Sequence, residues 1–385
     1  MPKLSVCIPV EPGQRAPLYL AGRLLENPES SIEIIVAPSD TASEGLGDLT
    51  ERAAKDGRLQ ILPAAADGSS ASDFWITTIT AATGDWTTLV SPEDMIEPDL
   101  PALLSHIENE HAGVDALGWN AFQIAPNAPR DVNAAVAVPI VHDISELEKA
   151  KMLEAFFQWS GSQQVPRMPF GLYHGAIKRE LAQTILSANS PLSWLTPLPR
   201  WEWAARVLIF ANGLGLSNRP LSAVSTAPFR TVDVSSALQG FPFDARIGVT
   251  ATIAEVQARV LHELGAAWSG FNENFVKACM IDCMHEHEEQ AFERKCQSYY
   301  SALHRMPGGP ALAEKFRPQF FSRPPDDPRR GLHGRTLLVD RFVADAQTAQ
   351  QFFEVVRSMI APIAVITGQL DLLSDKTSNG LVAAA

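Results

Sequence analysis

The sequence predicts an α/β fold, in which a Rossmann-like, mostly parallel sheet carries helices on both faces and a mainly helical C-terminal extension follows. Apolar runs at 4–10, 32–36 and 59–63 alternate with amphipathic stretches, a pattern typical of parallel strands joined by covering helices. From about residue 235 the pattern changes to long helical stretches rich in Glu, Ala and His. At 385 residues the chain is longer than most single domains. We therefore expect a first domain over 1–230 and a mainly helical accessory domain over 231–385.

The first domain is expected to begin with strands and helices in alternation. Each expected strand is a short apolar run, and each expected helix carries apolar residues at helical spacing. The strands are 4–10, 32–36, 59–63 and 86–90, and the helices between and after them are 16–26, 49–56, 73–82 and 98–107. Strands at 116–124 and 134–141, a helix at 144–159, and a helix over 199–210 that stops at Asn212-Gly213 continue the domain.

The second domain is expected to contain helices at 252–264 and 272–303, a Pro/Arg-rich connector near 318–335, a strand at 336–343 and a helix at 345–359. A local basic cluster lies in and after the connector, formed by Arg323, Arg329, Arg330, Arg335 and Arg341. These side chains could meet an anionic ligand, phosphate groups or a membrane surface. The simpler interpretation is a solvated linker that pairs with the acidic excess of the chain.

Composition excludes several classes of function. The net charge of −13 argues against a general nucleic-acid binder, because neutralising phosphates needs a basic surface. Four cysteines are too few for a disulfide framework, which favours reduced thiols. No apolar run approaches the roughly 20 residues of a membrane span. We expect a cytoplasmic protein, with peripheral association at the inner face of a membrane left open.

The stretch Gly84–Pro98 carries the main functional signal. An apolar strand ends there and is followed at once by Ser91, Pro92, Glu93 and Asp94. Ligands of open α/β sheets bind at the carboxyl ends of strands, and carboxylates there suit a hard divalent cation. No Gly-x-Gly-x-x-Gly follows the first strand and no Walker A sequence occurs, which weakens dinucleotide oxidoreduction and P-loop hydrolysis.

Three segments together resemble family 2 glycosyltransferases of GT-A fold. They are Leu4-Ser-Val-Cys-Ile-Pro-Val, Ile32-Glu-Ile-Ile-Val, and Ala81-Ala-Thr-Gly-Asp-Trp-Thr-Thr-Leu-Val-Ser-Pro-Glu-Asp. In the family, similar words occur in the same order, and the last precedes a metal-binding Asp-x-Asp. The resemblance is strong over about 100 residues and extends plausibly to about 220, and the C-terminal third is unmatched.

The resemblance implies an inverting transfer of a sugar from a nucleotide-diphosphate sugar to a saccharide or lipid-linked acceptor, in surface polysaccharide synthesis. It implies Mg²⁺ or Mn²⁺ at Glu93 and Asp94, bridging the diphosphate. Glu202, at the head of a late helix, would be the catalytic base that takes the acceptor proton. The implied donor-binding residues are Pro9, Glu11, Asp40, Asp67, Asp73 and Ser91, and the implied acceptor-binding residues are His174, Trp201 and Trp203.

Departures from the family pattern keep a second hypothesis open. Ser91 stands where the family has the first Asp of its metal motif, and Glu93 where it has the second. The alternative is therefore a non-catalytic GT-A-fold binding or scaffold protein that has lost the metal site. Each residue also has a structural interpretation: Ser91 to Asp94 as a helix cap, Asp40 as a loop residue that caps a turn, Asp73 as a helix cap, and Glu202 as an exposed helical carboxylate between core aromatics. A nucleotidyltransferase is disfavoured, because no Gly-rich, Lys/Arg-bearing loop follows the first strand.

Cys279, Cys283 and His287 recur at four-residue spacing, which raises the question of a zinc site. On one helix the outer pair would be about 12 Å apart, too far for one tetrahedral ion. We interpret these residues as a core stripe with surface histidines.

Overall fold

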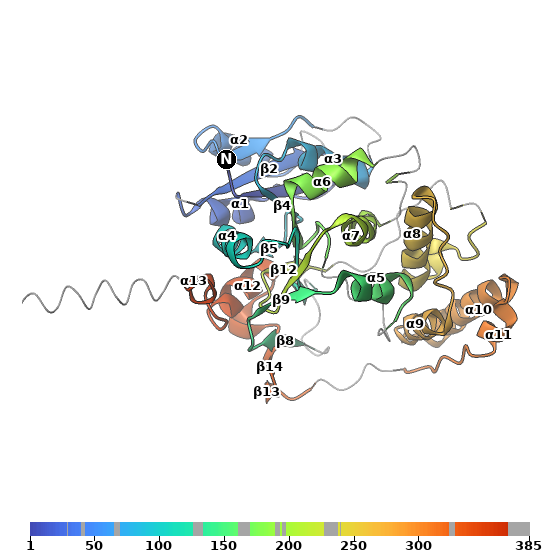
Figure 1. Cartoon of the computed structure of the whole chain (residues 1–385). Coiled ribbons are helices and arrows are strands. Elements are labelled where there is room, and N and C mark those ends of the chain that lie inside the picture. Colours follow the sequence, from blue (N-terminus) through green and yellow to red (C-terminus); the bar gives the residue numbers. More distant parts are fainter. Residues whose placement is uncertain are drawn as a thin grey trace, which may run out of the picture.

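The computed structural model describes residues 1–28, 30–39, 43–64, 70–125, 134–160, 170–188, 193–194, 198–226, 238, 240–322 and 328–368 (Figure 1). An eight-stranded sheet forms its centre, in the order β3-β2-β1-β4-β10-β6-β11-β9. The pairings make all strands parallel except β10 and β9. The bounds are β1 Leu4–Val10, β2 Ile32–Pro38, β3 Leu59–Ile61, β4 Trp86–Leu89, β6 Ala116–Trp119, β9 Ile144–Leu147, β10 Gly175–Lys178 and β11 Leu214–Ser217.

Helices cover both faces of this sheet. Successive strand side chains point to opposite faces, so Cys7 and Ile8 of β1 belong to two different apolar clusters. One cluster contains side chains of α3, α5, α6 and α7, and the other contains side chains of α1, α2 and α4. The bounds are α1 Leu18–Leu25, α2 Leu46–Ala53, α3 Ala71–Ala81, α4 Leu100–Glu110, α5 Lys149–Phe157, α6 Arg179–Ser187 and α7 Pro199–Phe210. The predicted α/β fold with a mostly parallel sheet is confirmed.

The turn before β4 gives structural roles to Glu33 and to Thr83-Gly84, which belong to two of the three segments that resemble glycosyltransferases. Glu33 of β2 accepts hydrogen bonds from the backbone N–H groups of Thr83 and Gly84 and from the Thr83 hydroxyl. Gly84 packs so closely on β1 that an added Cβ would lie 2.7 Å from Ser5 Oγ and 2.8 Å from Ser5 N. A side chain there would force the strands apart, so glycine is required by close approach. This turn sets the register at which β4 enters the sheet.

Two small sheets extend the first domain. One has the order β5-β12-β7, with β5 Met95–Ile96, β12 Ser222–Ser225 and β7 Phe122–Ile124. The other has the order β13-β14-β8, with β13 Gly331–His333, β14 Thr336–Asp340 and β8 Ala135–Pro139. Because β14 pairs with β8, the chain returns to the first domain after its helical part.

The helical part comprises α8 Val249–Glu263, α9 Glu273–Met284, α10 Glu289–Arg305 and α11 Gly309–Ala313. These helices gather on one side of the molecule (Figure 1). Arg206 of α7 joins them to the first domain, since its guanidinium lies 2.7 Å from both Glu202 Oε1 and Glu263 Oε2 of α8. The predicted helical C-terminal region is confirmed. The division at residue 230 stays a prediction.

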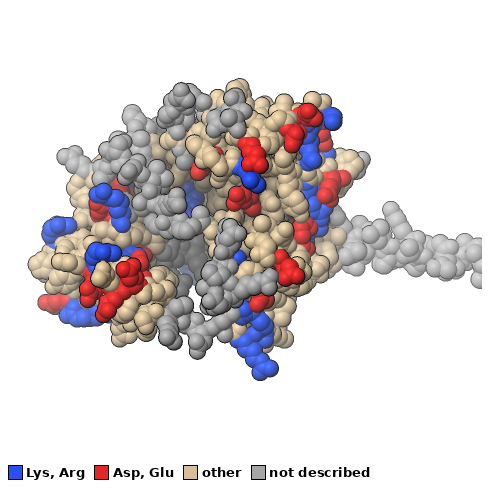
Figure 2. All heavy atoms as spheres, turned by 180° about the vertical axis from the view of Figure 1, so that it is seen from behind, with Lys and Arg blue, Asp and Glu red and all other residues tan. Residues whose placement is uncertain are grey.

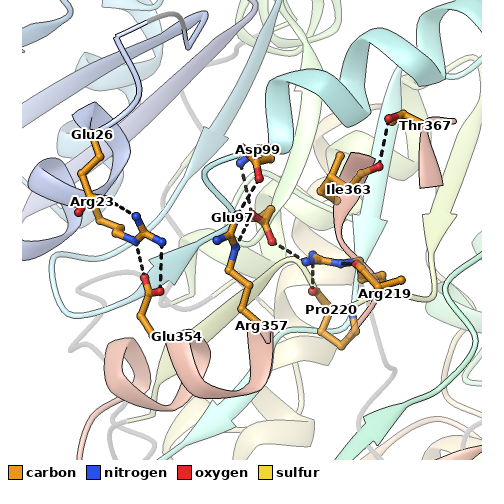
Figure 3. A network of polar contacts seen from close by, with 11 residues as sticks. Arg23, Glu26, Glu97, Asp99, Arg219, Pro220, Glu354, Arg357, Ile363 and Thr367 are labelled. Carbon is orange, nitrogen blue, oxygen red and sulfur yellow. Dashed lines mark hydrogen bonds and ion pairs between the residues drawn. The ribbon is translucent and has the colours of Figure 1, made fainter. Parts of the chain in front are cut away.

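The last described helices, α12 Ala349–Arg357 and α13 Ile363–Ile366, lie against the first domain. Figure 3 shows the polar contacts that hold them there. The buried Glu97 accepts from Arg219 at 2.6 Å and from Arg357 of α12 at 2.8 Å. Arg23 of α1 binds Glu354 of α12 at 2.8 Å. This segment, assigned to the accessory domain by sequence, therefore contributes to the core of the α/β part.

Three expected elements are wrong in detail. Residues 144–147 form strand β9, not the start of a helix, because they pair with β11. The expected strand 116–124 divides into β6 and β7, which belong to different sheets. The expected helix 272–303 is interrupted after Met284, and α10 begins at Glu289. In each case the apolar residues were identified correctly, but strand pairing or a break in the helix decided the secondary structure.

Within the described residues, no helix is long and apolar enough to cross a membrane. Of the basic cluster near the connector, Arg330 pairs with Asp340 at 3.4 Å, and Arg341 donates to the carbonyl of Ala125. Arg323 lies outside the described residues.

Candidate functional site

The loop Ser91–Asp94 lies at the carboxyl end of β4, as predicted. The loop closes on itself, with Asp94 N donating to Ser91 O at 3.1 Å. Pairing between β4 and the segment before β10 places a second loop beside it, because Leu89 N donates to Leu172 O and His174 N donates to Leu89 O. The sheet thus brings Tyr173-His174 next to Ser91–Asp94.

Asp94 is the centre of this arrangement and is fully buried. Its Oδ2 accepts from the Ser91 N–H at 2.8 Å, the Tyr173 hydroxyl at 2.8 Å and His174 Nε2 at 2.9 Å. Its Oδ1 accepts from the Ser225 N–H at 2.8 Å. Four donors from three segments therefore compensate one buried carboxylate, which is what makes its burial tolerable.

His174 continues the network to β6 and β12. Its Nδ1 lies 2.7 Å from Ser222 Oγ, which also accepts from Trp119 Nε1 at 2.7 Å. An indole N–H only donates, so Ser222 Oγ accepts from Trp119 and bridges it to His174, while His174 Nε2 donates to the Asp94 carboxylate. The His174 backbone has a positive φ of 52°, a conformation that is uncommon outside glycine.

Tyr173 connects the network to the outside. Its hydroxyl donates to Asp94 and lies 3.3 Å from Ser91 Oγ, and its ring stacks on Trp75 with centroids 5.7 Å apart. Burial, and then the adjacent Asp94 carboxylate, raise the pKa of Tyr173 well above its usual value. The hydroxyl therefore stays protonated and keeps donating.

The predicted metal pair, Glu93 and Asp94, stays a prediction, and its two carboxylates are placed differently. Oδ2 of Asp94 faces three protein donors and Oδ1 faces one, so an acceptor position remains on Oδ1. Glu93 is exposed and contacts only Ser225 Oγ, at 3.3 Å, among the described residues. The described part of the chain contains no group of three or more His, Cys, Asp or Glu residues placed to hold a metal ion. The helical stripe of Cys279, Cys283 and His287 is not such a group either, and Cys279 and Cys283 are buried in the core.

A cavity of about 740 Å³ adjoins the network. It opens between the ends of β6 and β7, strand β8 and the first turns of α7, and its walls are mainly aromatic and small apolar side chains. Its lining includes Trp119, Phe122, Phe170, Tyr173, His174, Arg200 and Trp201. His174 and Trp201, both predicted to contact an acceptor, therefore face one cavity. Trp203 does not line it, since it is fully buried with its ring 4.7 Å from that of Trp194.

Glu202 is placed differently from the predicted catalytic base. It is buried and does not line the cavity. Its Oε1 accepts from Arg206 at 2.7 Å and from the Trp194 N–H at 3.0 Å, while Oε2 has no hydrogen-bond partner among the described residues. Burial raises the pKa of Glu202. The lining residues Arg200, Trp201 and Ala204 lie within one turn of Glu202 on the same helix, but Glu202 points to the core instead.

The predicted donor residues lie around the carboxyl ends of β1 and β2. Pro9 is buried in β1, and Glu11 follows the strand half-buried, where burial raises its pKa. Asp73 takes its structural role, because it forms a capping box with Ser70 at the start of α3. Asp40 and Asp67 lie outside the described residues.

Several site residues were not found from the sequence. Tyr173, Ser222 and Trp119 carry no motif, and only strand pairing brings them together. Arg200 could have been noticed as a cation at the head of the helix whose Glu202 was singled out.

Comparison with family models found no match, and comparison with curated proteins found none either. Among solved structures, S. aureus TarS 1-349 in complex with UDP-GlcNAc is similar over 80% of this chain and 83% of that one, with 13% identity and a TM-score of 0.45. S. aureus TarS is similar over 87% of this chain and 60% of that one, with 12% identity and a TM-score of 0.45. At this sequence identity and TM-score, the likeness does not indicate what this chain binds.

Proposed function

We propose that this protein is a glycosyltransferase that moves a sugar from a nucleotide-diphosphate sugar to a saccharide or lipid-linked acceptor, in surface polysaccharide synthesis. The observation that carries the proposal is the position of the Asp94–His174–Tyr173 network, at the carboxyl end of a central parallel strand and beside an aromatic cavity. Ligands of open α/β sheets bind at this edge. The motif order of the first 100 residues supports the same class.

The contacts suggest separate places for the nucleotide and for the saccharide. The ends of β1, β2 and β4 would hold the nucleotide, and the cavity would hold the saccharide, with the partly exposed Trp201 offering an aromatic face to a sugar ring. Asp94 acts as a positioning residue, since it fixes Tyr173 and His174 at the boundary between the two. The exposed Glu93 and the remaining acceptor position on Asp94 Oδ1 are the groups that would hold a divalent ion, and we route no step through one.

Calorimetry with UDP-, GDP- and dTDP-sugars tests the proposal. We expect one of these donors to bind, and titrations with Mn²⁺ and with EDTA measure how much a divalent cation contributes to its affinity. Tyr173→Phe should weaken binding or transfer, because it removes the hydroxyl between Ser91 and Asp94. The matched control is Tyr300→Phe on α10, where the ring is 45% exposed and distant from the loop. Failure of all three donors to bind would reject the proposal.

A second candidate function is a non-catalytic binding protein of the same fold. The observation that favours it is the withdrawal of Glu202 into an ion pair with Arg206, which leaves the described lining of the cavity without a carboxylate base. Donor hydrolysis and transfer assays separate the two candidates. Donor binding without turnover, with a panel of saccharide acceptors, would favour the binding protein.

A further inference from the structure

Arg200 is a cation at the cavity wall without a described counterion. It lies in the first turn of α7 and is exposed, and no hydrogen bond or ion pair connects it to another described residue. Other arginines of this region are neutralised. Arg206 on the same helix binds Glu202 and Glu263, and Arg219 binds Glu97. Among the described residues, none neutralises the charge of Arg200.

The described lining of the cavity contains no Asp or Glu, although the chain has 44 acidic residues. The nearest carboxylate of the network, Asp94, lies behind His174 and is compensated by four donors. The N-terminal end of α7, twelve residues long, adds its positive dipole end on the side of Arg200. Figure 2 shows acidic and basic side chains intermixed in clusters at the left and right of that face. The described lining of the cavity differs from these clusters, because it carries one Arg and no carboxylate.

The rest of the lining suits a sugar. Trp201 provides partly exposed aromatic surface, whereas the rings of Trp119 and Phe122 are buried, and Asn120, Gln123 and Thr336 provide groups that can pair with hydroxyls. A volume of about 740 Å³ can hold a small oligosaccharide segment. An apolar wall with a few polar groups and one cation is selective for a ring that carries a negative group.

We propose that this cavity binds an anionic saccharide as the acceptor, with a phosphate or carboxylate group of that saccharide on Arg200. The assignment rests on the proposed function, because it names the acceptor class of that reaction. A phosphate group bound to Arg200 could also belong to the diphosphate of the donor. Competition between a sugar phosphate and a nucleotide separates these two sources.

The test measures binding of glucose 6-phosphate, glucose, inorganic phosphate and UDP by calorimetry, without turnover. We expect glucose 6-phosphate to bind at least tenfold more tightly than glucose. Arg200→Gln should weaken glucose 6-phosphate about ten- to a hundredfold, as loss of a charge-assisted hydrogen bond does, and Arg200→Lys should restore part of the affinity. The control Arg246→Gln removes an exposed arginine of the helical part and should change nothing.

Each outcome supports or overturns the assignment. Equal affinity for glucose and glucose 6-phosphate, or an unchanged Arg200→Gln variant, would overturn the proposal. Competition between UDP and glucose 6-phosphate would assign Arg200 to the donor diphosphate and overturn the acceptor assignment. Binding of glucose 6-phosphate together with failure of every nucleotide sugar would leave the cavity assignment standing and reject the glycosyltransferase. Far-UV circular dichroism of each variant checks that it is folded.

Discussion

Asp94 illustrates how burial changes what a carboxylate can do. In the sequence it is an acidic residue after a strand, as a metal ligand would be. In the fold its two oxygens accept from backbone and side-chain donors of three separate segments. A carboxylate bonded in this way stabilises the loop, with Oδ2 surrounded by three donors and one acceptor position left on Oδ1.

Asp94→Asn should lower the free energy of unfolding by about 2–4 kcal/mol, because the amide nitrogen would face donors where an oxygen now accepts. Glu93→Gln is the matched control, since this exposed neighbour should change stability by no more than about 0.5 kcal/mol. Urea unfolding of the metal-free protein measures both. Equal, small effects would show that Asp94 is not the structural centre of the loop.

The sequence was a good guide to which loop matters and a poor one to what its residues do. Ser91, Glu93 and Asp94 follow a strand that is visible from its apolar run. Their partners Tyr173 and Ser225 lie about 80 and 130 positions later. Local pattern contains no information about such pairings, because they depend on which strands become neighbours.

At the scale of elements, strand order decides the site. The insertion of β10 between β4 and β6, antiparallel to both, carries Tyr173-His174 to the end of β4. The alternating strands and helices of the first 100 residues were predictable, because each is a short apolar or amphipathic run. The C-terminal helix was predicted as well, but its place was not. Nothing in a helical pattern tells which surface the helix will cover.

Helix α12 supplies an element-scale prediction. Phe352 is fully buried, and its ring meets that of Phe122 at 5.4 Å. Phe352→Ala should therefore lower the unfolding free energy by about 3–5 kcal/mol. Phe321→Ala, whose ring is 46% exposed, should cost far less. We expect the loss to appear in a single cooperative transition of the α/β part, followed by circular dichroism. A separate transition for the C-terminal segment would contradict its integration.

At the scale of the whole molecule, a buried ion cluster joins the α/β part to the helical part. Arg206 on α7 contacts Glu202 on the same helix and Glu263 on α8, and its guanidinium lies 4.5 Å from the Trp194 ring centroid. Removing one member of a buried cluster leaves uncompensated charge, which costs more than the pair itself contributes. The two parts are therefore coupled electrostatically as well as by apolar packing.

Arg206→Met should lower the unfolding free energy by about 3–5 kcal/mol at neutral pH. Burial already raises the pKa of Glu202, and loss of the arginine raises it further. A carboxyl group whose pKa is higher in the folded state stabilises that state as pH falls, so the deficit should shrink as pH falls toward about 4.5 and below. Denaturant unfolding of wild type and variant at several pH values measures the difference. A deficit that stays constant with pH would contradict the mechanism.

The return of the chain to its first domain has a consequence for synthesis. As the protein is made from its N-terminus, the sheet β5-β12-β7 is complete once Ser225 has emerged, yet the helix that covers it, α12, begins only at Ala349. During the intervening residues its apolar surface has no cover from this helix, and Glu97 lacks Arg357. In this interval the uncovered surface of the nascent chain is open to aggregation or to chaperones. The loop that holds Asp94 is also completed late, because the Asp94 carbonyl accepts a hydrogen bond from Gln350 of α12.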